Sequence, residues 1–397
     1  MATLDAKFAF QGWAAPALVK VAGLTEFASG TYPLERMVLD LREPKTRQAS
    51  STLARLPWAG FLVDSPEDAP AGRPWIAAND QALALGSGDV IEVIPANGKV
   101  ARRYRRGANN NIFFATERCN SFCLMCSQPP RQIEDDWRVE HLCDLAALID
   151  RDTPSLTVTG GEPTLLGEGL NRVVARCASV LPNTALHILS NGRNFERPGL
   201  AQSFDGLHPA LTWGIPLYGD TYELHDYIVQ SQGAYAQTLR GLYALEAAHQ
   251  RIEIRVVLVR PVVERLPALA RFIYRNLPFV SHVALMGTEP TGFARAHQDT
   301  LWIDPADMSS PLTEAVDKLA RRDIPVSLYN FPLCTLPKAL WPHAQRSISD
   351  WKQHYLPACE TCQVRNRCGG FFAWVTDPWT SRAIKPIRDE ETTCVRP

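Results

Sequence analysis

A strand-and-helix pattern that repeats six times between residues 109 and 325 constrains the fold more than any other feature of the sequence. Each repeat is a short apolar run followed by a stretch whose apolar residues lie three or four positions apart, the spacing of an amphipathic helix. The apolar runs show few alternating polar positions, as expected of parallel strands covered on both faces. We therefore predict an α/β fold, a curved and incomplete (β/α)6 barrel whose functional end lies at the carboxyl ends of its strands. The expected strands are 111–116, 155–163, 185–192, 211–219, 251–260 and 281–287, and the expected helices lie over 137–150, 170–181, 195–204, 235–245, 266–273 and 312–319.

The segments on either side of this repeat have a different character. The sequence GDVIEVIPANGKVARRY predicts a hairpin of Val90–Ile94 and Lys99–Tyr104 around a turn at Asn97-Gly98. After residue 325 the sequence is rich in proline and predicts loops. We expect a small, mainly β N-terminal domain over 1–108, the barrel over 109–325 and a loop-rich, cluster-binding extension over 326–397.

Composition limits the classes of function. The chain has 397 residues, of which 46% are hydrophobic and 21% charged, so it can form two or three folded domains. Its formal net charge of −1 lacks the bulk positive charge that binds nucleic acid or anionic membranes. No run approaches 18 apolar residues, and the N-terminus shows no basic region followed by an apolar stretch. We therefore expect a cytoplasmic protein that has neither a membrane nor a nucleic acid as partner.

Ten cysteines in a chain without an export signal favour metal or redox chemistry over a disulfide framework. Cys119, Cys123 and Cys126 lie within eight residues, in CNSFCLMC, directly after the first predicted strand. Three thiolates can bind one small metal centre, but a tetrahedral zinc site needs a fourth ligand, and none follows nearby. A cubane iron–sulfur cluster has four corners, so three cysteines leave one iron open to a further ligand, which is typical of a catalytic site.

A second cysteine group lies in the C-terminal extension and comprises Cys334, Cys359, Cys362 and Cys368. Four thiolates complete the ligands of a cubane cluster or of a zinc site, and spacing alone does not choose between the two. Helical spacing turns Cys143 and Cys177 toward apolar faces, where we expect them to pack. Cys394 is open to either role.

The first cysteine group resembles the Cys-x3-Cys-x2-Cys signature of the radical S-adenosylmethionine (SAM) superfamily. Gly160-Gly161-Glu162-Pro163, after the second strand, resembles that superfamily's GGE motif, and Ser190-Asn191-Gly192, after the third, resembles its ribose-contacting segment. The resemblance covers roughly residues 110–290 and implies a barrel of radical SAM type, a [4Fe-4S] cluster with an open iron, and reductive cleavage of S-adenosylmethionine to a 5′-deoxyadenosyl radical. The SAM contacts that it implies are Gly160, Gly161, Glu162, Pro163, Ser190, Asn191 and Met125, the last in a position that is often aromatic.

Further segments resemble one subfamily, the HxsC radical SAM maturases of the His-Xaa-Ser system. They are ATERCNSFCLMCSQPPR, SNGRNF, WGIPLYGDTYELHDYIVQ, YNFPLCTLP and CETCQVRNRCGGFF. This resemblance implies modification of a ribosomally made peptide or protein, a substrate bearing His-Xaa-Ser repeats, a second radical SAM protein as partner, and an electron donor such as flavodoxin or ferredoxin. The second cysteine group resembles the SPASM and twitch extensions. It implies one auxiliary [4Fe-4S] cluster, because Phe372 stands where a full SPASM extension continues with cysteine.

Two alternatives remain open: a radical SAM enzyme that acts on a small-molecule cofactor precursor and, from another class, a zinc-stabilised binding protein. No residue is identified as the catalytic acid or base. We expect His225-Asp226 to brace the helix after the fourth strand. Arg255 and Arg260 could meet a carboxylate or form structural ion pairs, and Glu289 could reach the mouth of the site. For the basic run Arg102–Arg106 we expect a solvated linker face in preference to a docking site for an acidic partner.

Overall fold

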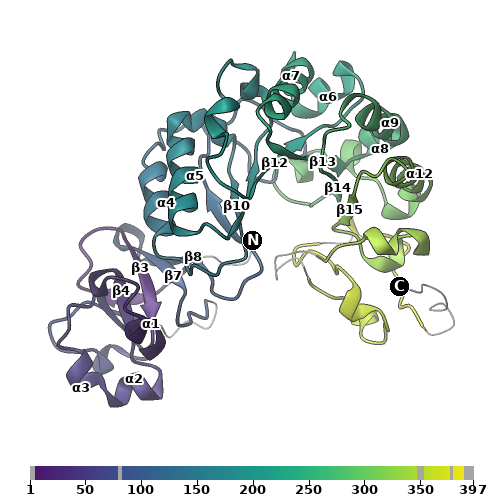
Figure 1. Ribbon diagram of the computed structural model, residues 1–397. Helices are drawn as coiled ribbons and strands as arrows, with labels where there is room; N and C mark the ends of the chain where they lie inside the picture. The colour runs from purple at the N-terminus through teal and green to yellow at the C-terminus, as the bar shows by residue number, and fades with distance from the viewer. Residues whose placement is uncertain (1–4, 79–82, 347–352, 376–378, 389–397) are drawn as a thin grey trace.

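The computed structural model describes residues 5–78, 83–346, 353–375 and 379–388, which form a curved parallel α/β barrel flanked by two smaller parts (Figure 1). The barrel sheet has the spatial order β15-β14-β13-β12-β11-β10-β9, so β9 and β15 are its edges and the barrel is incomplete within the described residues. The strands are β9 (Asn111–Phe114), β10 (Ser155–Thr159), β11 (Ala185–Leu189), β12 (Leu211–Pro216), β13 (Arg251–Leu258), β14 (His282–Gly287) and β15 (Val326–Tyr329), all paired in parallel.

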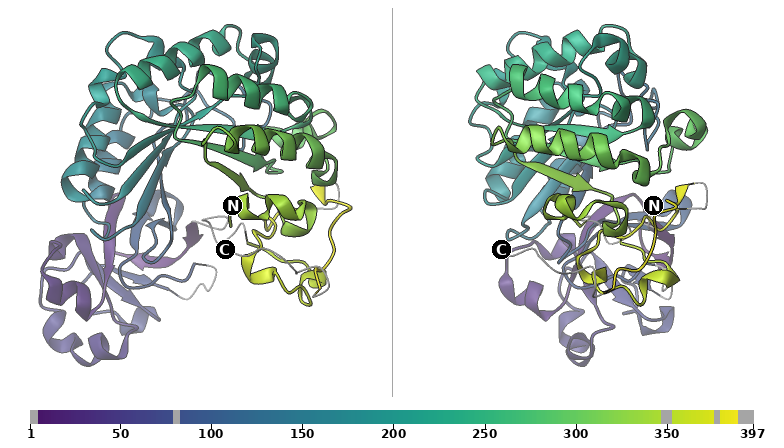
Figure 2. Two further views of the ribbon diagram at one scale, coloured as in Figure 1. Left: turned by 45° about the vertical axis from the view of Figure 1, so that its right-hand side comes forward. Right: turned by 90° about the vertical axis from the view of Figure 1, so that its right-hand side faces the viewer.

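The helices lie on the outer, convex side of this sheet (Figures 1 and 2). They pack on every second strand residue, as β13 illustrates: Ile252, Ile254 and Val256 are buried in the main core and alternate with Glu253 and Arg255. The helices are α4 (Arg138–Ala146), α5 (Glu168–Val180), α6 (Tyr222–Val229), α7 (Ala234–Ala247), α8 (Arg260–Glu264), α9 (Leu266–Asn276), α10 (Phe293–Ala296), α11 (Gln298–Leu301) and α12 (Ser309–Ala320).

The α/β partial barrel predicted from the sequence is confirmed, and all six expected strands are present. The structure adds a seventh strand, β15, which pairs with β14 and lies beyond the expected end of the barrel at residue 325. The helix expected over 195–204 is wrong, because two separate 3₁₀ turns, Arg193–Glu196 and Gln202–Phe204, stand there. Pro198 and Gly199, the latter at φ +84°, interrupt any regular helix between them.

The N-terminal part contains an eight-stranded mixed sheet in the order β1-β8-β7-β3-β4-β5-β6-β2. The predicted hairpin is confirmed: β7 (Val90–Ile94) and β8 (Lys99–Tyr104) pair antiparallel around Gly98, which adopts φ +66°. The strand-rich region agrees with the mainly β domain that we expected. Its other elements are β1 (Asp5–Lys7), β2 (Ala9–Gln11), β3 (Ala17–Ala22), α1 (Leu24–Ser29), β4 (Met37–Asp40), α2 (Pro44–Gln48), α3 (Ser50–Leu53), β5 (Gly60–Val63) and β6 (Trp75–Ala77).

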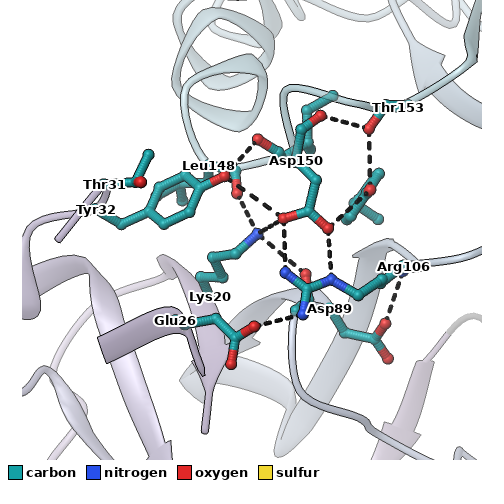
Figure 3. A network of polar contacts seen from close by, with 12 residues as sticks. Lys20, Glu26, Thr31, Tyr32, Asp89, Arg106, Leu148, Asp150 and Thr153 are labelled. Carbon is teal, nitrogen blue, oxygen red and sulfur yellow. Dashed lines mark hydrogen bonds and ion pairs between the residues drawn. The ribbon is translucent and has the colours of Figure 1, made fainter. Parts of the chain in front are cut away.

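A buried polar network joins this N-terminal part to the barrel (Figure 3). Lys20 of β3 is fully buried, and its Nζ donates to Asp150 Oδ1 and to the Leu148 carbonyl, both at 2.8 Å. Arg106 donates to both oxygens of Asp150, at 2.6 and 2.8 Å, and pairs with Glu26 of α1. Because Asp150 follows α4 of the barrel, one carboxylate ties the two parts together.

The same network corrects our interpretation of the basic run Arg102–Arg106 as a solvated linker face. Tyr104 is buried, with 3% of its surface exposed. Arg103 pairs with Glu92 at 2.6 Å, and Arg106 belongs to the junction network. Arg103 and Arg106 therefore pair with acidic groups of their own chain, although Arg105 and Arg106 remain exposed.

The C-terminal extension follows β15 and lies at the opposite end of the arc from the N-terminal part (Figures 1 and 2). Its described turns are the 3₁₀ segments Leu333–Thr335, Lys338–His343, Pro357–Cys359 and Arg365–Arg367. Asp304 anchors it to the barrel by accepting hydrogen bonds from Ser381 Oγ at 2.5 Å and from the Arg382 backbone at 3.1 Å. No helix among the described residues has the length and apolar character needed to cross a bilayer.

Candidate functional site

The loop that carries the first cysteine group (residues 115–126, the cysteine loop) leaves β9 and packs against the glycine pair that follows β10. Gly161 N donates to the Thr116 carbonyl at 2.7 Å, and Glu162 N donates to the Arg118 carbonyl at 2.8 Å. A Cβ on Gly160 would lie 2.4 Å from the Thr116 oxygen, and one on Gly161 would lie 2.0 Å from the Arg118 oxygen. Two motifs that are separate in the sequence therefore form one unit, in which close approach requires glycine.

The three thiols of the cysteine loop are half-buried and lie close enough to interact electrostatically. Burial, and then the neighbouring Cys126 and Cys119, raise the pKa of Cys123. Burial and the carboxylate of Glu162 raise the pKa of Cys119 to about 12, and burial raises the pKa of Cys126. Free thiols of this kind are neutral at pH 7, so binding a metal centre would release their protons.

Two further elements hold the cysteine loop in place. Phe122 N and Leu124 N donate to the carbonyls of residues 229 and 228 at the end of α6, at 3.1 and 2.9 Å. On another side, Phe293 N at the start of α10 donates to the Cys126 carbonyl at 2.9 Å. Since backbone hydrogen bonds fix the loop to three different segments, the fold itself sets the positions of the thiols.

Glu162 is fully buried and connects the ends of β10 and β11. Its Oε1 accepts hydrogen bonds from Thr164 N at 3.0 Å, Thr164 Oγ1 at 2.5 Å and Ser190 Oγ at 2.8 Å, and its Oε2 accepts from Asn191 N at 2.6 Å. Burial raises the pKa of Glu162, although these hydrogen bonds act in the opposite direction. The predicted contacts Glu162, Ser190 and Asn191 are thus one hydrogen-bonded group. Among the described residues Oε2 accepts fewer hydrogen bonds than Oε1, so Oε2 is the oxygen that can accept a further one.

Three residues that the sequence analysis did not single out belong to the same surroundings. Asn191 Nδ2 donates to Asn120 Oδ1 at 2.5 Å, and the guanidinium of Arg193 donates to the Asn120 carbonyl. Tyr218 follows β12 and is buried. Burial is the largest cause of its raised pKa, and the thiols of Cys123 and Cys126 raise that pKa further. Asn120 and Arg193 lie inside the motifs CNSFCLMC and SNGRNF, and that neighbourhood was their only signal in the sequence.

Pro163 and Met125, two other predicted SAM contacts, are both buried. Pro163 begins the 3₁₀ turn Pro163–Leu166 directly after Glu162, a position that suits its fixed φ. Met125 is 8% exposed and packs in the main apolar core. A SAM contact for either residue stays a prediction.

The second cysteine group comes together in the C-terminal extension. Burial raises the pKa of Cys334, and the nearby thiols of Cys368, Cys359 and Cys362 raise it further. Three backbone N–H groups donate to these sulfurs at 3.3 to 3.4 Å: those of Leu333 and Gly370 to Cys368 and that of Ile387 to Cys362. Donors of this kind stabilise thiolates and tune the sulfur ligands of iron.

The numbers of cysteines, three in the cysteine loop and four in the extension, are those that cubane clusters take as ligands. All nine described cysteines are free thiols. In the described ranges, no three or more His, Cys, Asp or Glu side chains are grouped so that they could hold a metal ion. Cys177 is buried in the core and Cys143 is half-buried against it, in keeping with the expected packing roles, whereas Cys394 lies outside the described residues.

His225 and Asp226 brace helices, as expected. His225 is 1% exposed, its Nδ1 accepts from Tyr218 N at 3.2 Å, and burial lowers its pKa to about 4. Asp226 accepts from Gly233 N and Tyr235 N, at 2.6 and 2.7 Å, at the start of α7. Both side chains therefore fix the path of the chain around α6 and α7.

The other polar candidates take different places. Arg260 begins α8 and donates to the Trp302 carbonyl at 2.8 Å, which is a structural contact. Glu289 lies between β14 and α10, where its carbonyl accepts from Thr291 N at 2.9 Å. Arg255 donates to Glu253 on the inner face of the barrel, at 2.5 Å.

No protein-family profile matches the sequence, and no curated protein does. Solved structures that match part of this chain include SuiB of Streptococcus suis bound to S-adenosylmethionine, at a TM-score of 0.45 and 14% identity over 63% of this chain and 55% of that chain. They also include native anSMEcpe with bound AdoMet, at a TM-score of 0.43 and 15% identity over 55% of this chain and 62% of that chain. A third is TYW1 with a lysine-pyruvate adduct, at a TM-score of 0.35 and 14% identity over 51% of this chain and 70% of that chain.

Structures of SuiB with the precursor peptide SuiA and of anSMEcpe with the Cp18Cys peptide match as well. This chain covers less than two thirds of SuiB and of anSMEcpe. Because these TM-scores lie below 0.5, the matches assign neither a family nor an activity to this chain.

Proposed function

We propose that this protein is a radical SAM enzyme that modifies a ribosomally made peptide or protein. The observation that supports this most is the contact between the cysteine loop and the Gly-Gly-Glu turn. It brings Cys119 beside the buried carboxylate of Glu162, next to strands β9, β10 and β11, with Cys123 and Cys126 in the same loop. The carboxyl ends of parallel strands are where (β/α) barrels bind their ligands.

In this proposal the cysteine loop holds a [4Fe-4S] cluster that leaves one iron for SAM. When bound and reduced, this pair supplies a 5′-deoxyadenosyl radical, which removes a hydrogen atom from an unactivated C–H bond. The chain itself binds and orients. Glu162 holds Ser190 and Asn191 at the end of β11, where the hydroxyl and the amide can contact ribose hydroxyls or the methionine carboxylate. Gly160 and Gly161 let the backbone approach closely.

The four thiols of the extension are proposed to hold one auxiliary [4Fe-4S] cluster, supported by their proximity and by the N–H groups directed at their sulfurs. The sequence resemblance to His-Xaa-Ser maturases supports a peptide substrate with such repeats, a second radical SAM protein as partner, and flavodoxin or ferredoxin as electron donor. A cytoplasmic location fits thiol ligands, which must stay reduced to bind iron.

The test is anaerobic reconstitution of the full chain with iron and sulfide, followed by reduction in the presence of SAM. Two cubane clusters predict about eight irons per chain, and reduction should release 5′-deoxyadenosine. Replacing Cys119, Cys123 or Cys126 by Ala should remove about four irons and abolish deoxyadenosine. Cys143→Ala is the matched control, because it removes a half-buried thiol of α4 and should leave the iron content and the release of 5′-deoxyadenosine unchanged.

Other outcomes of the same experiment would support one of the two alternative functions. Stoichiometric zinc without SAM cleavage supports a zinc-stabilised binding protein and contradicts the proposal. A synthetic peptide with His-Xaa-Ser repeats serves as the substrate probe, and its intact mass should change only with the reconstituted, reduced protein. SAM cleavage with an unchanged peptide mass and consumption of a small molecule supports action on a cofactor precursor.

A further inference from the structure

A row of three polar side chains crosses three adjacent strands on the inner face of the barrel. His282 Nδ1 of β14 lies 2.7 Å from Glu253 Oε2 of β13, and His282 Nε2 lies 2.9 Å from Ser327 Oγ of β15. A carboxylate only accepts hydrogen bonds, so Nδ1 carries the proton and Nε2 is left to accept from the Ser327 hydroxyl. Carboxylate, imidazole and hydroxyl in this order form the arrangement by which a histidine activates a serine.

The groups around Glu253 keep it charged. Arg255 Nη1 donates to its Oε1 at 2.5 Å, and His187 Nε2 of β11 lies 3.5 Å from the same oxygen. Burial would raise the pKa of Glu253, but the hydrogen bond with His282 and the charge of Arg255 outweigh it and lower the pKa to about 2. Burial lowers the pKa of His187 to about 4, so that ring is neutral at pH 7. Glu253 can therefore stabilise a cation beside it but is a poor proton acceptor itself.

The hydroxyl of Ser327 has a second neighbour, Tyr329, two residues along β15 and on the same face. Burial raises the pKa of Tyr329, which keeps the phenol protonated at pH 7. Both Ser327 and His282 are half-buried, so the inner face leaves part of each side chain accessible.

The sheet places Glu253 two strands away from the end of β11, which leads into Ser190 and Asn191 of the candidate SAM site. Glu253 pairs in the sheet with Gly214, and Gly214 pairs with Leu189, the last residue of β11. A Cβ on Gly214 would lie 2.8 Å from both Arg255 Cδ and His187 Nε2, so the glycine makes room for the charged groups. Tyr218 gives a second link, because both the thiols of the cysteine loop and Arg255 act on its pKa.

We propose that Ser327, His282 and Glu253 form a proton relay that deprotonates the substrate inside the barrel; the role on a substrate rests on the proposed function. Ser327 Oγ takes the proton of a weakly acidic N–H, O–H or S–H group of the substrate while its own proton passes to His282 Nε2. No electron moves in this step, and the imidazolium that forms is paired with the Glu253 carboxylate. His282 is the proton acceptor, and Glu253 is a positioning residue that acts through it.

Diisopropyl fluorophosphate tests the relay without cluster, SAM or substrate, because a serine whose proton can pass to a histidine attacks it. The bond from Ser327 Oγ to phosphorus forms, the P–F bond breaks, fluoride leaves, and His282 takes the proton. In the full chain we expect the diisopropylphosphoryl group on Ser327, located by mass spectrometry of the digest. The labelling rate should exceed that of His282→Gln by about 10²- to 10⁴-fold.

Two variants of Glu253 distinguish the effect of its negative charge from the effect of its packing in the fold. Glu253→Gln should slow labelling by about tenfold or more, whereas Glu253→Asp, which keeps the charge, should recover much of the rate. Ser281→Ala is the matched control. Ser281 neighbours His282, but its hydroxyl donates to the Ile252 carbonyl at 2.8 Å, so the variant should label Ser327 at the wild-type rate. Circular dichroism confirms that each variant is folded.

Equal labelling of the wild type and His282→Gln overturns the relay. So does the absence of label on Ser327 from both diisopropyl fluorophosphate and the smaller methanesulfonyl fluoride. Because labelling is done without iron, sulfide or SAM, the two proposals fail separately. A chain that labels but does not cleave SAM contradicts the proposed function, and a chain that cleaves SAM but does not label contradicts the relay.

Discussion

Replacing Asp150 by Asn should destabilise the protein, because it removes the carboxylate on which the junction network centres. Lys20 is fully buried with its Nζ 2.8 Å from Asp150, whose own side chain is 12% exposed. Removing one partner of a buried ion pair costs about 3–5 kcal/mol, since the other charge stays buried and unpaired. Arg106, the second cation, is 38% exposed and partly screened by water. We therefore expect the lower end of that range, about 3 kcal/mol.

The same carboxylate predicts a pH dependence. Burial would raise the pKa of Asp150, but hydrogen bonds from Arg106 and Lys20 lower it from 3.8 to about 2. A carboxyl group whose pKa is lowered in the folded state stabilises that state above its unfolded pKa, and the stabilisation is lost as the pH falls through the folded pKa. The shift corresponds to about 2 kcal/mol. The wild type should lose this amount between roughly pH 5 and pH 2, and Asp150→Asn should not.

Urea unfolding of the full chain, followed by tryptophan fluorescence, measures both effects. Asp144→Asn is the matched control, because this carboxylate is 60% exposed and lies 3.7 Å from Arg36, and its loss should cost less than about 0.5 kcal/mol. The double variant Lys20→Met/Asp150→Asn should be more stable than Asp150→Asn alone, since no buried lysine is left unpaired. An Asp150→Asn midpoint equal to that of Asp144→Asn, or a double variant less stable than Asp150→Asn, would refute this reasoning.

Three further predictions concern the candidate site. Gly161→Ala places a Cβ 2.0 Å from the Arg118 carbonyl, so the iron bound by the cysteine loop should fall several-fold, whereas Gly86→Ala, with nothing within 4 Å, should retain it. Glu162→Gln places an amide N–H where the carboxylate accepts hydrogen bonds from N–H and O–H donors, so the free energy of unfolding should fall by about 1–3 kcal/mol. Urea unfolding measures this loss, and an unchanged midpoint contradicts the hydrogen-bonded network. Cys362→Ala should remove about four irons and abolish peptide modification while deoxyadenosine is still released; equal loss of both contradicts a separate auxiliary role.

The sequence predicted the barrel because its strands and helices follow simple periodic patterns. Buried positions recur at every second residue in the strands and at every third or fourth residue in the helices, so the pattern is visible in the sequence itself. The missed strand β15 is four residues long and lies in a stretch rich in proline, so it depends on pairing with β14 instead of on its own propensity. The false helix at 195–204 came from apolar spacing that ignored Pro198 and Gly199.

The candidate site was predictable where its chemistry is local in sequence. The cysteine loop and the turn at Gly160-Gly161 are each short motifs whose residue types point to their use. Their contact was not predictable from spacing, because it needs β9 and β10 to pair. Arg193 lies inside the segment SNGRNF, but its hydrogen bond to the Asn120 carbonyl could be seen only in the fold.

The inner face of the barrel explains why the row Ser327, His282 and Glu253 escaped sequence analysis. We read the strands as covered on both faces, and their outer positions, such as Ile254, do pack in the apolar core. Several inner positions, including Glu253, His282 and Ser327, instead carry polar groups that are half-buried or buried, and burying such groups is unfavourable unless they pair with one another. They do pair, across strands that lie far apart in sequence. An apolar inner face would cover this space at no such cost, so the polar row is better explained by chemistry inside the barrel than by stability of the fold.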